Sequence, residues 1–397
     1  MTNNLIPVET AKELVMEHCK SLPAILLPIS QTLNTILAED TFARIDMPGF
    51  DQSAMDGYAF CFNDYDASKT LEVAGESFAG NKELLPLKKN TATRIFTGAP
   101  VPSGADTVVM QEHTIRTGDQ LQIDSPKITT GLNVRKQGSE IHKGALALKA
   151  GIRLTPAAIG FLAGIGISEV KVFGFPAITI IATGKELVQP GNPLSHGQVY
   201  ESNTLTLTAA LQHLHITNVK NFWVDDNVED LIAAVNNALQ QSDLILITGG
   251  VSVGDYDYVI PALQHCGVET IFHKVKQRPG KPLFFGRKEN KMIFGLPGNP
   301  SSVLSCYYNY VLLALQKLMH RNDPLLNSKK VPLENSFEKN IGLTHFLKGY
   351  FDNEKVRYLT AQESYRLSSF ALSNCLIEIP ADVEKVPAGE LVTVHLL

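Results

Sequence analysis

Glycine-rich turns stand at three places where an apolar run of the sequence gives way to a helical pattern. These turns are Thr183–Glu186, Thr248–Asp257 and Gly295–Pro300. Glycine lets backbone N–H groups approach a ligand closely, and Asn299-Pro300 combines a helix N-cap with a proline at the first helical position. Because helix N-termini attract negative charge, the turns predict a rim that binds an anion.

The middle turn has the spacing of a nucleotide-binding P-loop without its cation. Gly249 and Gly254 are placed as in a P-loop, but Asp255 and Tyr256 stand where lysine and a hydroxyl residue would follow. Backbone N–H groups next to Asp255 and Asp257 suit a phosphate bridged by Mg²⁺, which prefers hard oxygen ligands. A glycine turn followed by two solvated aspartates is the alternative interpretation.

Basic residues gather in one short segment downstream. Lys274, Lys276 and Arg278 alternate along the chain, and Pro279-Gly280 turns it before Lys281. If the segment is a strand, its period of two places the three cations on one face. In a chain of formal net charge −5, they would form a local trap for a multiply charged anion. A strand edge guarded by lysines is the alternative interpretation.

Acidic residues follow the same pattern of strand ends and helix starts. They are Glu186, Glu201, Asp225, Asp226, Asp255 and Asp257. Each alone is explained as a charge that favours a helix N-terminus. Together they predict an acidic rim beside a basic floor, which is an arrangement for a phosphorylated substrate and a divalent metal ion.

Strands and helices alternate from about residue 177 to residue 320. The expected strands are 177–182, 219–224, 244–247 and 292–294, and the expected helices are 203–213, one capped by Asn227, and 300–319. Continuously apolar strands that alternate with helices predict a parallel sheet covered on both faces. The turns and acidic residues then lie where open α/β sheets bind their ligands.

Two further helices are expected outside this region. Thr10 and Glu13 form a capping-box pair at the start of an N-terminal helix. The other helix begins at Pro156, with Thr155 as its N-cap.

The remaining segments are predicted to be β-rich. Residues 46–140 carry short β-prone runs between Gly/Pro turns, which predicts a mostly β insertion. Beyond Pro324, short strands at 376–379 and 391–395 predict a small β domain. With 397 residues, the chain is longer than one hydrophobic core usually organises, so we expect two to four domains.

Composition excludes several classes of protein. The chain is 44% hydrophobic and 19% charged, which argues against both a disordered and a membrane protein. The N-terminus lacks the basic start of a signal peptide. The net charge gives no bulk attraction to nucleic acid or an acidic membrane. The five cysteines are scattered without a Cys-x-x-Cys pair, which argues against a disulfide framework or zinc cluster and favours the reducing cytoplasm.

Five segments, in order along almost the whole chain, resemble the signature blocks of the molybdopterin molybdenumtransferases. They are Met47–Ala59, Thr97–Pro102, Thr248–Asp255, Arg278–Pro282 and Gly295–Pro300. Enzymes of this family insert molybdate into adenylated molybdopterin with Mg²⁺ and release AMP, in the last step of molybdenum cofactor synthesis. The C-terminal domain of gephyrin is their animal relative.

The resemblance implies a multidomain α/β fold. Its parts are a helical domain of residues 1–46 and 141–173, a β-rich insertion 47–140, a three-layer α/β molybdopterin-binding domain 174–322 with a parallel sheet, and a C-terminal β domain 323–397. It implies a cytoplasmic homodimer whose active site is shared between the α/β domain of one subunit and the insertion of the other. It also allows transient contact with the adenylyltransferase, and it implies no nucleic-acid or membrane partner.

The resemblance also implies roles for individual residues. The implied catalytic residues are Asp56, Thr97, Glu186, Asp225, Asp257, Lys274 and Arg278. Glu186, Asp225 and Asp257 would handle the metal and the pyrophosphate, whereas Asp56 and Thr97 would reach the site from the partner subunit. The sequence shows no Ser-His-Asp or Cys-His grouping, so we expect metal-assisted, electrostatic catalysis without a covalent intermediate.

The implied substrate-binding residues extend this set. They are Gly249, Gly250, Ser252, Gly254, Lys281, Pro297, Gly298, Asn299, Pro300, Lys348 and Ser364. Lys281 would hold molybdate or the phosphates together with Lys274 and Arg278. Pro297 and Pro300 would shape the loop.

The chain departs from the family pattern at four positions. Glu140 stands where aspartate is commoner, Arg278 replaces the usual lysine, and Lys348 replaces an arginine. Arg278 should favour bidentate contacts with an oxyanion. Lys185 occupies a place where a small polar or acidic residue is commoner, so it could pair with Glu186 or weaken metal binding.

Two other functions fit parts of the pattern. A molybdopterin adenylyltransferase is one, because the α/β domain alone resembles that enzyme and a nicotinamide-nucleotide hydrolase family; the insertion and the C-terminal domain argue against it. A gephyrin-like scaffold module is the other. The absence of an adjoining adenylyltransferase domain or long linker in the 397 residues argues against scaffolding.

Overall fold

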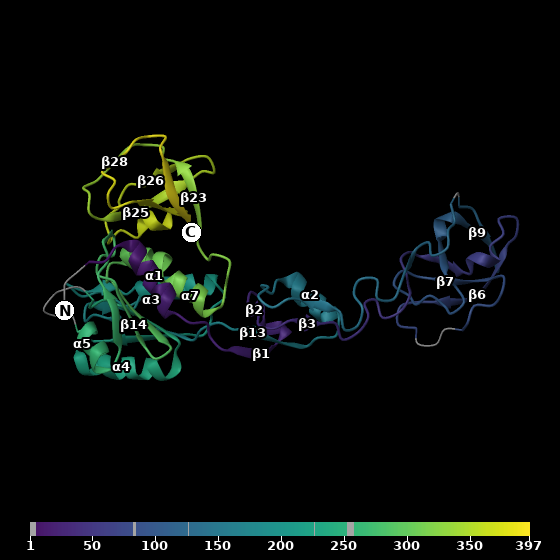
Figure 1. Cartoon of the computed structure of the whole chain (residues 1–397), viewed down its shortest axis with the longest axis horizontal. Coiled ribbons are helices and arrows are strands. Elements are labelled where there is room, and N and C mark those ends of the chain that lie inside the picture. The colour runs from purple at the N-terminus through teal and green to yellow at the C-terminus, as the bar shows by residue number, and fades with distance from the viewer. Residues whose placement is uncertain (1–4, 82–84, 126, 226, 252–257) are drawn as a thin grey trace. The chain divides into compact units, whose positions relative to one another are not determined.

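The computed structural model describes residues 5–81, 85–125, 127–225, 227–251 and 258–397 (Figure 1). The chain divides into two compact units, which are described separately. The first unit comprises residues 1–25, 34–36 and 173–397, and the second comprises 26–33 and 37–172. The finer division into four domains stays a prediction.

A six-stranded sheet forms the centre of the first unit. Its order is β17 (Val219–Val224), β14 (Ile178–Thr183), β18 (Leu244–Thr248), β22 (Lys291–Leu296), β21 (Phe284–Lys288) and β19 (Glu269–His273). The four predicted strands, β17, β14, β18 and β22, are parallel. β21 runs antiparallel to both of its neighbours, so the sheet is mixed where a purely parallel one was expected.

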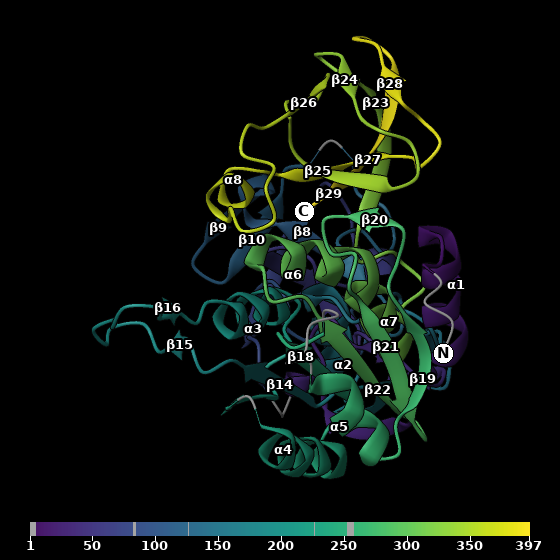
Figure 2. The same cartoon turned by 90° about the vertical axis from the view of Figure 1, so that its left-hand side faces the viewer.

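Helices cover both faces of this sheet, as predicted (Figure 2). On one face lie α1 (Val8–His18), α3 (Asn203–His213), α6 (Pro300–Cys306) and α7 (Leu312–Leu318), and on the other lie α4 (Val228–Gln241) and α5 (Val259–His265). Alternate strand residues point to opposite faces. Thus Ile180 and Leu246 pack into the first core, whereas Ile181 and Ile247 pack into the second.

Of the predicted helix starts, the one at Asn227 is right and the one at Thr10 is wrong. Asn227 caps α4 by accepting a hydrogen bond from the Asp230 backbone N–H at 2.8 Å. The helix expected at 300–319 contains a π-helical turn, Tyr307–Val311, between α6 and α7. The capping box at Thr10 is wrong, because α1 begins at Val8, directly after Pro7, without a side-chain cap.

The C-terminal part of the first unit is a β-sheet with its own core. Its order is β20 (Gln277–Arg278), β25 (Thr344–Phe351), β27 (Cys375–Ile379), β29 (Leu391–Leu396) and β23 (Asn327–Pro332), and β26 (Val356–Tyr358) pairs with β25. Smaller elements are β24 (Phe337–Glu338), β28 (Lys385–Val386), β15 (Leu187–Val188), β16 (Val199–Tyr200) and α8 (Ser368–Ala371). Because β20 immediately precedes Pro279, this sheet holds one end of the predicted basic turn.

The second unit is mostly β, as predicted for the insertion. Its largest sheet has the order β8 (Thr107–Met110), β5 (Gly57–Phe60), β7 (Thr91–Ile95), β6 (Leu71–Ser77), β10 (Gln120–Ile123) and β9 (Thr114–Thr117). The other sheets are β1 (Ala24–Pro28) with β13 (Glu169–Phe173) and β2 (Ile36–Leu37), β11 (Val134–Arg135) with β4 (Gln52–Ser53), and β12 (Leu146–Leu148) with β3 (Thr41–Phe42). The predicted helix α2 (Pro156–Gly164) is capped by Thr155, whose hydroxyl accepts from the Ala158 N–H at 3.2 Å.

Within the described residues, no helix combines the length and the apolar character that a membrane span requires. All five cysteines lie in described segments and are free thiols.

Candidate active site

The three predicted glycine turns meet at the carboxyl edge of the parallel strands. A Cβ atom on Gly249 would lie 2.7 Å from the Thr183 carbonyl oxygen and 3.0 Å from its Oγ1, and the φ of Gly249 is +90°. A Cβ on Gly298 would lie 3.8 Å from the Gly249 Cα. Only glycine therefore fits at Gly249, where two backbones approach each other. We call the turns at Thr183–Glu186, Gly249–Gly250 and Pro297–Pro300 the anion rim.

Buried polar atoms without partners line this rim. Within the described segments, neither Thr183 Oγ1, Asn203 Oδ1 nor Ser301 Oγ has a hydrogen-bond partner. Asn203, at the start of α3, uses its other atom, Nδ2, to donate to the Gly298 carbonyl at 2.9 Å. Because unsatisfied buried polar groups are costly, such atoms mark a place where a polar ligand can bind. Asn203 was not among the predicted site residues, and its place at the start of the expected helix 203–213 is its one signal in the sequence.

The acidic side of the site is built by the ends of β14 and β17. Asp225, Glu201 and Gly184 line a cavity of about 190 Å³. The Glu186 carboxylate folds against Gly184, where an added Cβ would lie 2.7 and 2.9 Å from its two oxygens. Glu201 is 3% exposed and accepts hydrogen bonds from the Thr204 hydroxyl and, at 2.9 Å, its N–H. The Glu201 carboxylate therefore accepts from an N–H in the first turn of α3, as the alternative interpretation of an acidic residue at a helix start expects.

The predicted metal ligands are described only in part. Asp257 lies outside the described residues, as do Asp226, Asp255, Ser252 and Gly254. Among the residues that are described, no three His, Cys, Asp or Glu side chains are grouped as metal ligands. The metal set of Glu186, Asp225 and Asp257 stays a prediction.

The basic segment does not form one strand. β19 ends at His273, Lys274 has a φ of +76°, and the chain is extended again only in β20. A single strand through all three cations is therefore wrong. The alternation of burial nevertheless persists, because Val275 and Gln277 are buried while Lys276 and Arg278 are exposed.

A buried polar cluster holds the turn that carries Arg278 and Lys281. Gln277 Nε2 donates to the Gly280 carbonyl at 2.9 Å, and Gln277 Oε1 accepts from the Tyr310 hydroxyl. Gly280 has a φ of +83°, and a Cβ there would lie 2.5 Å from the Cys306 Sγ. Burial raises the pKa of the Cys306 thiol to about 12, so this thiol is neutral. Neither Gln277 nor Tyr310 was predicted as a site residue, because their contact joins positions that are 33 residues apart in the sequence.

Ser364 is docked on the start of α6. Asn299 is the residue before α6, as predicted, but its side chain does not cap the helix. Instead Asn299 Nδ2 donates to the Ser364 Oγ at 2.9 Å, and the Ser301 N–H donates to the Ser364 carbonyl at 3.1 Å. The C-terminal β domain thereby places Ser364 beside the anion rim.

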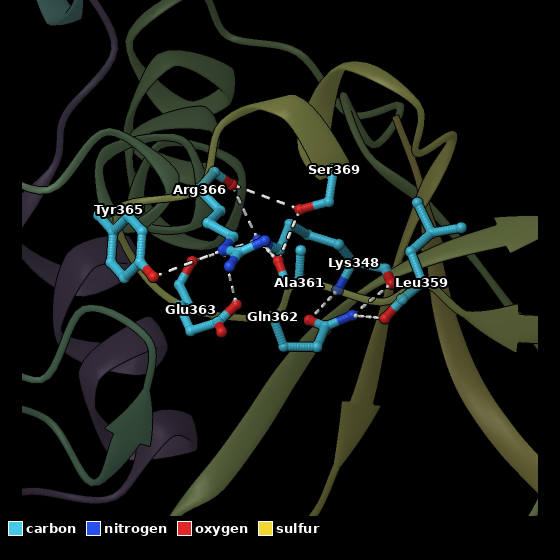
Figure 3. A network of polar contacts seen from close by, with 8 residues as sticks. All are labelled: Lys348, Leu359, Ala361, Gln362, Glu363, Tyr365, Arg366 and Ser369. Carbon is cyan, nitrogen blue, oxygen red and sulfur yellow. Dashed lines mark hydrogen bonds and ion pairs between the residues drawn. The ribbon is translucent and has the colours of Figure 1, made fainter.

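Lys348 holds the loop that carries Ser364 (Figure 3). This side chain is 2% exposed, and its Nζ donates to the carbonyls of Ala361 at 2.8 Å, Arg366 at 3.0 Å and Glu363 at 3.3 Å. Burial lowers the pKa of Lys348. Since its three ammonium protons are directed at backbone carbonyls, Lys348 acts on the loop, and direct substrate contact by Lys348 stays a prediction.

Asp56 and Thr97 lie in the second unit and contact each other. Asp56 Oδ1 accepts from the Thr97 N–H at 2.7 Å and from its hydroxyl at 2.8 Å. Arg94 lies over the rings of Tyr58 and Phe96, with its Cζ 5.2 and 4.7 Å from their centroids. The hydrogen bonds from the Thr97 backbone and side chain, with the Arg94 charge, hold the pKa of Asp56 below its usual value.

Family models match three successive parts of the chain. They describe the MoeA N-terminal region (domain I and II) at residues 6–166, a probable molybdopterin binding domain at 179–317, and the MoeA C-terminal region (domain IV) at 330–397. These three regions follow the same order as the insertion, the α/β sheet and the C-terminal sheet.

Named relatives match over nearly the whole length. A molybdopterin molybdenumtransferase of Haemophilus influenzae is 37% identical over 385 residues, covering 94% of each chain. One from Staphylococcus aureus is 31% identical over 402 residues, covering 99% of this chain and 96% of the relative. The crystal structure of a molybdopterin biosynthesis MoeA protein from Pyrococcus horikosii superposes with a TM-score of 0.80 at 32% identity and 99% coverage of both chains. The chain therefore belongs to the MoeA family of molybdopterin molybdenumtransferases.

Proposed function

We propose that this protein transfers molybdenum from molybdate to adenylated molybdopterin and releases AMP in a Mg²⁺-dependent reaction. The observation that carries the proposal is the meeting of three glycine turns around Thr183, whose buried Oγ1 has no partner among the described residues. Such an edge suits a ligand with several phosphate oxygens, because it offers backbone N–H groups and helix N-termini. Family membership supports the choice of a molybdopterin as that ligand.

The cations would hold the oxyanions. Arg278 and Lys281 flank a turn that Gln277 holds through a hydrogen bond to Gly280, and Asn299 fixes Ser364 beside the anion rim. Arg278 offers a planar fork to molybdate or phosphate, and Lys281 a point charge. Their role is to bring two anions together and to stabilise the charge that develops as the pyrophosphate link is hydrolysed, so that AMP leaves and the pterin keeps its own phosphate.

The carboxylates suit a magnesium ion. Asp225 borders a small cavity at the sheet edge, and the Glu186 carboxylate lies against Gly184. Hard oxygen donors of this kind are what Mg²⁺ takes, so Glu186 and Asp225, with Asp257, would hold it. When bound, the ion would neutralise pyrophosphate charge and favour departure of AMP.

The proposal includes a cytoplasmic homodimer with a shared site. Asp56 and Thr97 would act in the site of the partner subunit, where an ionised Asp56 can orient a proton or a water molecule. The exposed position and lowered pKa of Asp56 support this role. Transient contact with the adenylyltransferase would deliver the adenylated substrate.

The test is a mass-spectrometric assay with the purified protein, adenylated molybdopterin, molybdate and Mg²⁺. We expect AMP release and formation of molybdenum-loaded pterin only when both molybdate and Mg²⁺ are present. Consumption of ATP with unmodified molybdopterin would indicate an adenylyltransferase instead. AMP release that is independent of molybdate would contradict the proposed transfer.

A further inference from the structure

A large cavity lies beside Arg278 on the C-terminal β domain. Its volume is about 800 Å³, and Arg278, Phe337, Lys339, His345 and Lys385 are among the residues that line it. The parallel pairing of β20 with β25 places Arg278 directly opposite His345. We call this the C-terminal cavity. The roles proposed above use only Arg278 of these residues.

Lys339 is an unusual feature of the C-terminal cavity. The residue is 8% exposed, yet its Nζ makes a single hydrogen bond in the described part of the chain, 3.4 Å long, to the Ala381 carbonyl. Burial lowers the pKa of Lys339, and the Asp382 charge opposes this shift only in part. A buried ammonium with one long hydrogen bond is poorly compensated. An anion in the cavity would supply the missing partner.

The other charged groups around the cavity leave this positive charge largely unopposed. The Lys385 ammonium pairs with the Glu338 carboxylate, so these two charges offset each other. Glu384 and Asp382 are exposed carboxylates whose influence is screened by water. No ion pair to Arg278 occurs among the described side chains. Arg278 and Lys339 therefore contribute two positive charges to the lining of the C-terminal cavity.

The His345 ring is influenced by the charges of both Lys339 and Arg278. Burial, Lys339 and Arg278 together lower its pKa to about 4, so the ring is neutral at pH 7. Its ring lies edge-on to Phe337, with centroids 6.2 Å apart. A neutral imidazole can donate one hydrogen bond to an oxyanion. The combination of a guanidinium fork, an ammonium and an N–H donor fits a tetrahedral dianion.

We propose that Arg278, Lys339 and His345 form a second oxyanion site, separate from the anion rim; of these three residues, only Arg278 also has a role in the proposed reaction. The ligand class is a tetrahedral oxyanion, which is either free molybdate or the phosphate group of a nucleotide. Because Arg278 is also proposed to hold the reacting oxyanions, an oxyanion bound here would wait next to the proposed reaction centre. The second oxyanion site rests on the proposed function and extends it. Oxyanion binding at this site does not require molybdenum transfer, so it can be measured without the pterin.

The test is an NMR titration of the histidine side chains in the full-length protein. The His345 signal is assigned by its loss in His345→Gln, and sodium molybdate, sodium phosphate, AMP and sodium chloride are added in separate series at constant ionic strength. We expect the pKa of His345 to rise by about one or more in the presence of the preferred oxyanion, because a nearby anion favours the charged ring. Chloride should have no effect.

Two matched variants locate the binding. Lys339→Gln should weaken oxyanion binding at His345 by about tenfold or more, the scale of one lost charge-assisted hydrogen bond. Lys385→Gln removes a cation from the same cavity, but one that Glu338 already neutralises, and should leave binding unchanged.

The anion that moves the His345 signal identifies the ligand. A response to molybdate alone identifies the transferred oxyanion as the ligand, and a response to phosphate or AMP identifies a nucleotide phosphate. A His345 signal that none of these anions moves in the wild-type protein overturns the proposal, whether or not AMP release is observed.

Discussion

Asp56 Oδ1 receives two hydrogen bonds from one residue, the N–H of Thr97 at 2.7 Å and its hydroxyl at 2.8 Å. Both donors stabilise the carboxylate over the carboxylic acid, and they lower the pKa of Asp56. The pair joins the start of β5 to the turn after β7, so two signature blocks that are 41 residues apart in sequence form one local structure. Any role of Asp56 in catalysis therefore depends on Thr97.

The first prediction concerns this pair. Thr97→Val removes the hydroxyl donor and keeps the backbone N–H, so the pKa of Asp56 should move up toward its usual value. An ionised Asp56 would then be lost at a higher pH as the solution is acidified, and the acid limb of the AMP-release profile should shift to higher pH. Thr117→Val, which removes the hydroxyl of an exposed threonine in β9, is the control. An unchanged acid limb would contradict a catalytic carboxylate at Asp56.

The second prediction concerns the metal side of the site. Asp225→Ala should abolish AMP release while pterin binding stays measurable, because the carboxylate would bind the ion and not the pterin ring. Glu229→Ala removes an exposed acid in the first turn of the neighbouring α4 and should leave activity near normal. Turnover and equilibrium binding are measured on the same preparations. AMP release that persists in Asp225→Ala, or loss of pterin binding in that variant, would argue against the metal role.

The third prediction concerns the basic turn. Gly280→Ala should lower the free energy of unfolding by about 2 kcal/mol or more, because a left-handed alanine costs roughly 1–2 kcal/mol before any steric clash, and the new Cβ would meet Cys306 Sγ at 2.5 Å. The control is Gly389→Ala, which has a similar φ of +86° and nothing within 4 Å of the added Cβ. Urea denaturation of both variants measures the difference. Equal losses would show that the Cys306 contact adds nothing.

The fourth prediction concerns Lys348. Lys348→Met removes the donor that the carbonyls of Ala361, Glu363 and Arg366 share. Each carbonyl keeps a second donor, which is the Ser369 hydroxyl for Ala361 and Arg366 and the Arg366 N–H for Glu363. A hydrogen bond to a charged group contributes about 1.5–3 kcal/mol, so the loop should be destabilised on that scale. Amides of residues 361–369 should exchange hydrogen faster, and the KM for molybdate should rise because Ser364 loses its fixed position. Lys355→Met, at an ion pair on the surface, serves as the control. A variant whose 361–369 amides stay protected would show that other contacts hold the loop.

Local patterns in the sequence were sufficient for most of the secondary structure. The helix Asn203–His213 and the strand Val219–Val224 have the predicted bounds, because apolar periodicity and N-caps act within a few residues. The capping-box pattern at Thr10 gave a wrong helix start, because a short local pattern does not include the packing of the helix. Helix α1 already begins at Val8, and its buried residues Ala11 and Val15 pack against α7.

Only the tertiary structure decided how these pieces form a site. That Gly249 lies against Thr183, that Gln277 reaches Tyr310 and that Lys348 points into a ring of carbonyls are contacts between distant segments. No short pattern encodes them, because they arise when strands pair and helices pack on the sheet. The sequence by itself determined the elements, the residue types at their ends and, through its signature blocks, the family. Packing determined which polar groups are satisfied within the fold, as with Glu201, and which have no hydrogen-bond partner among the described residues, as with Thr183 Oγ1.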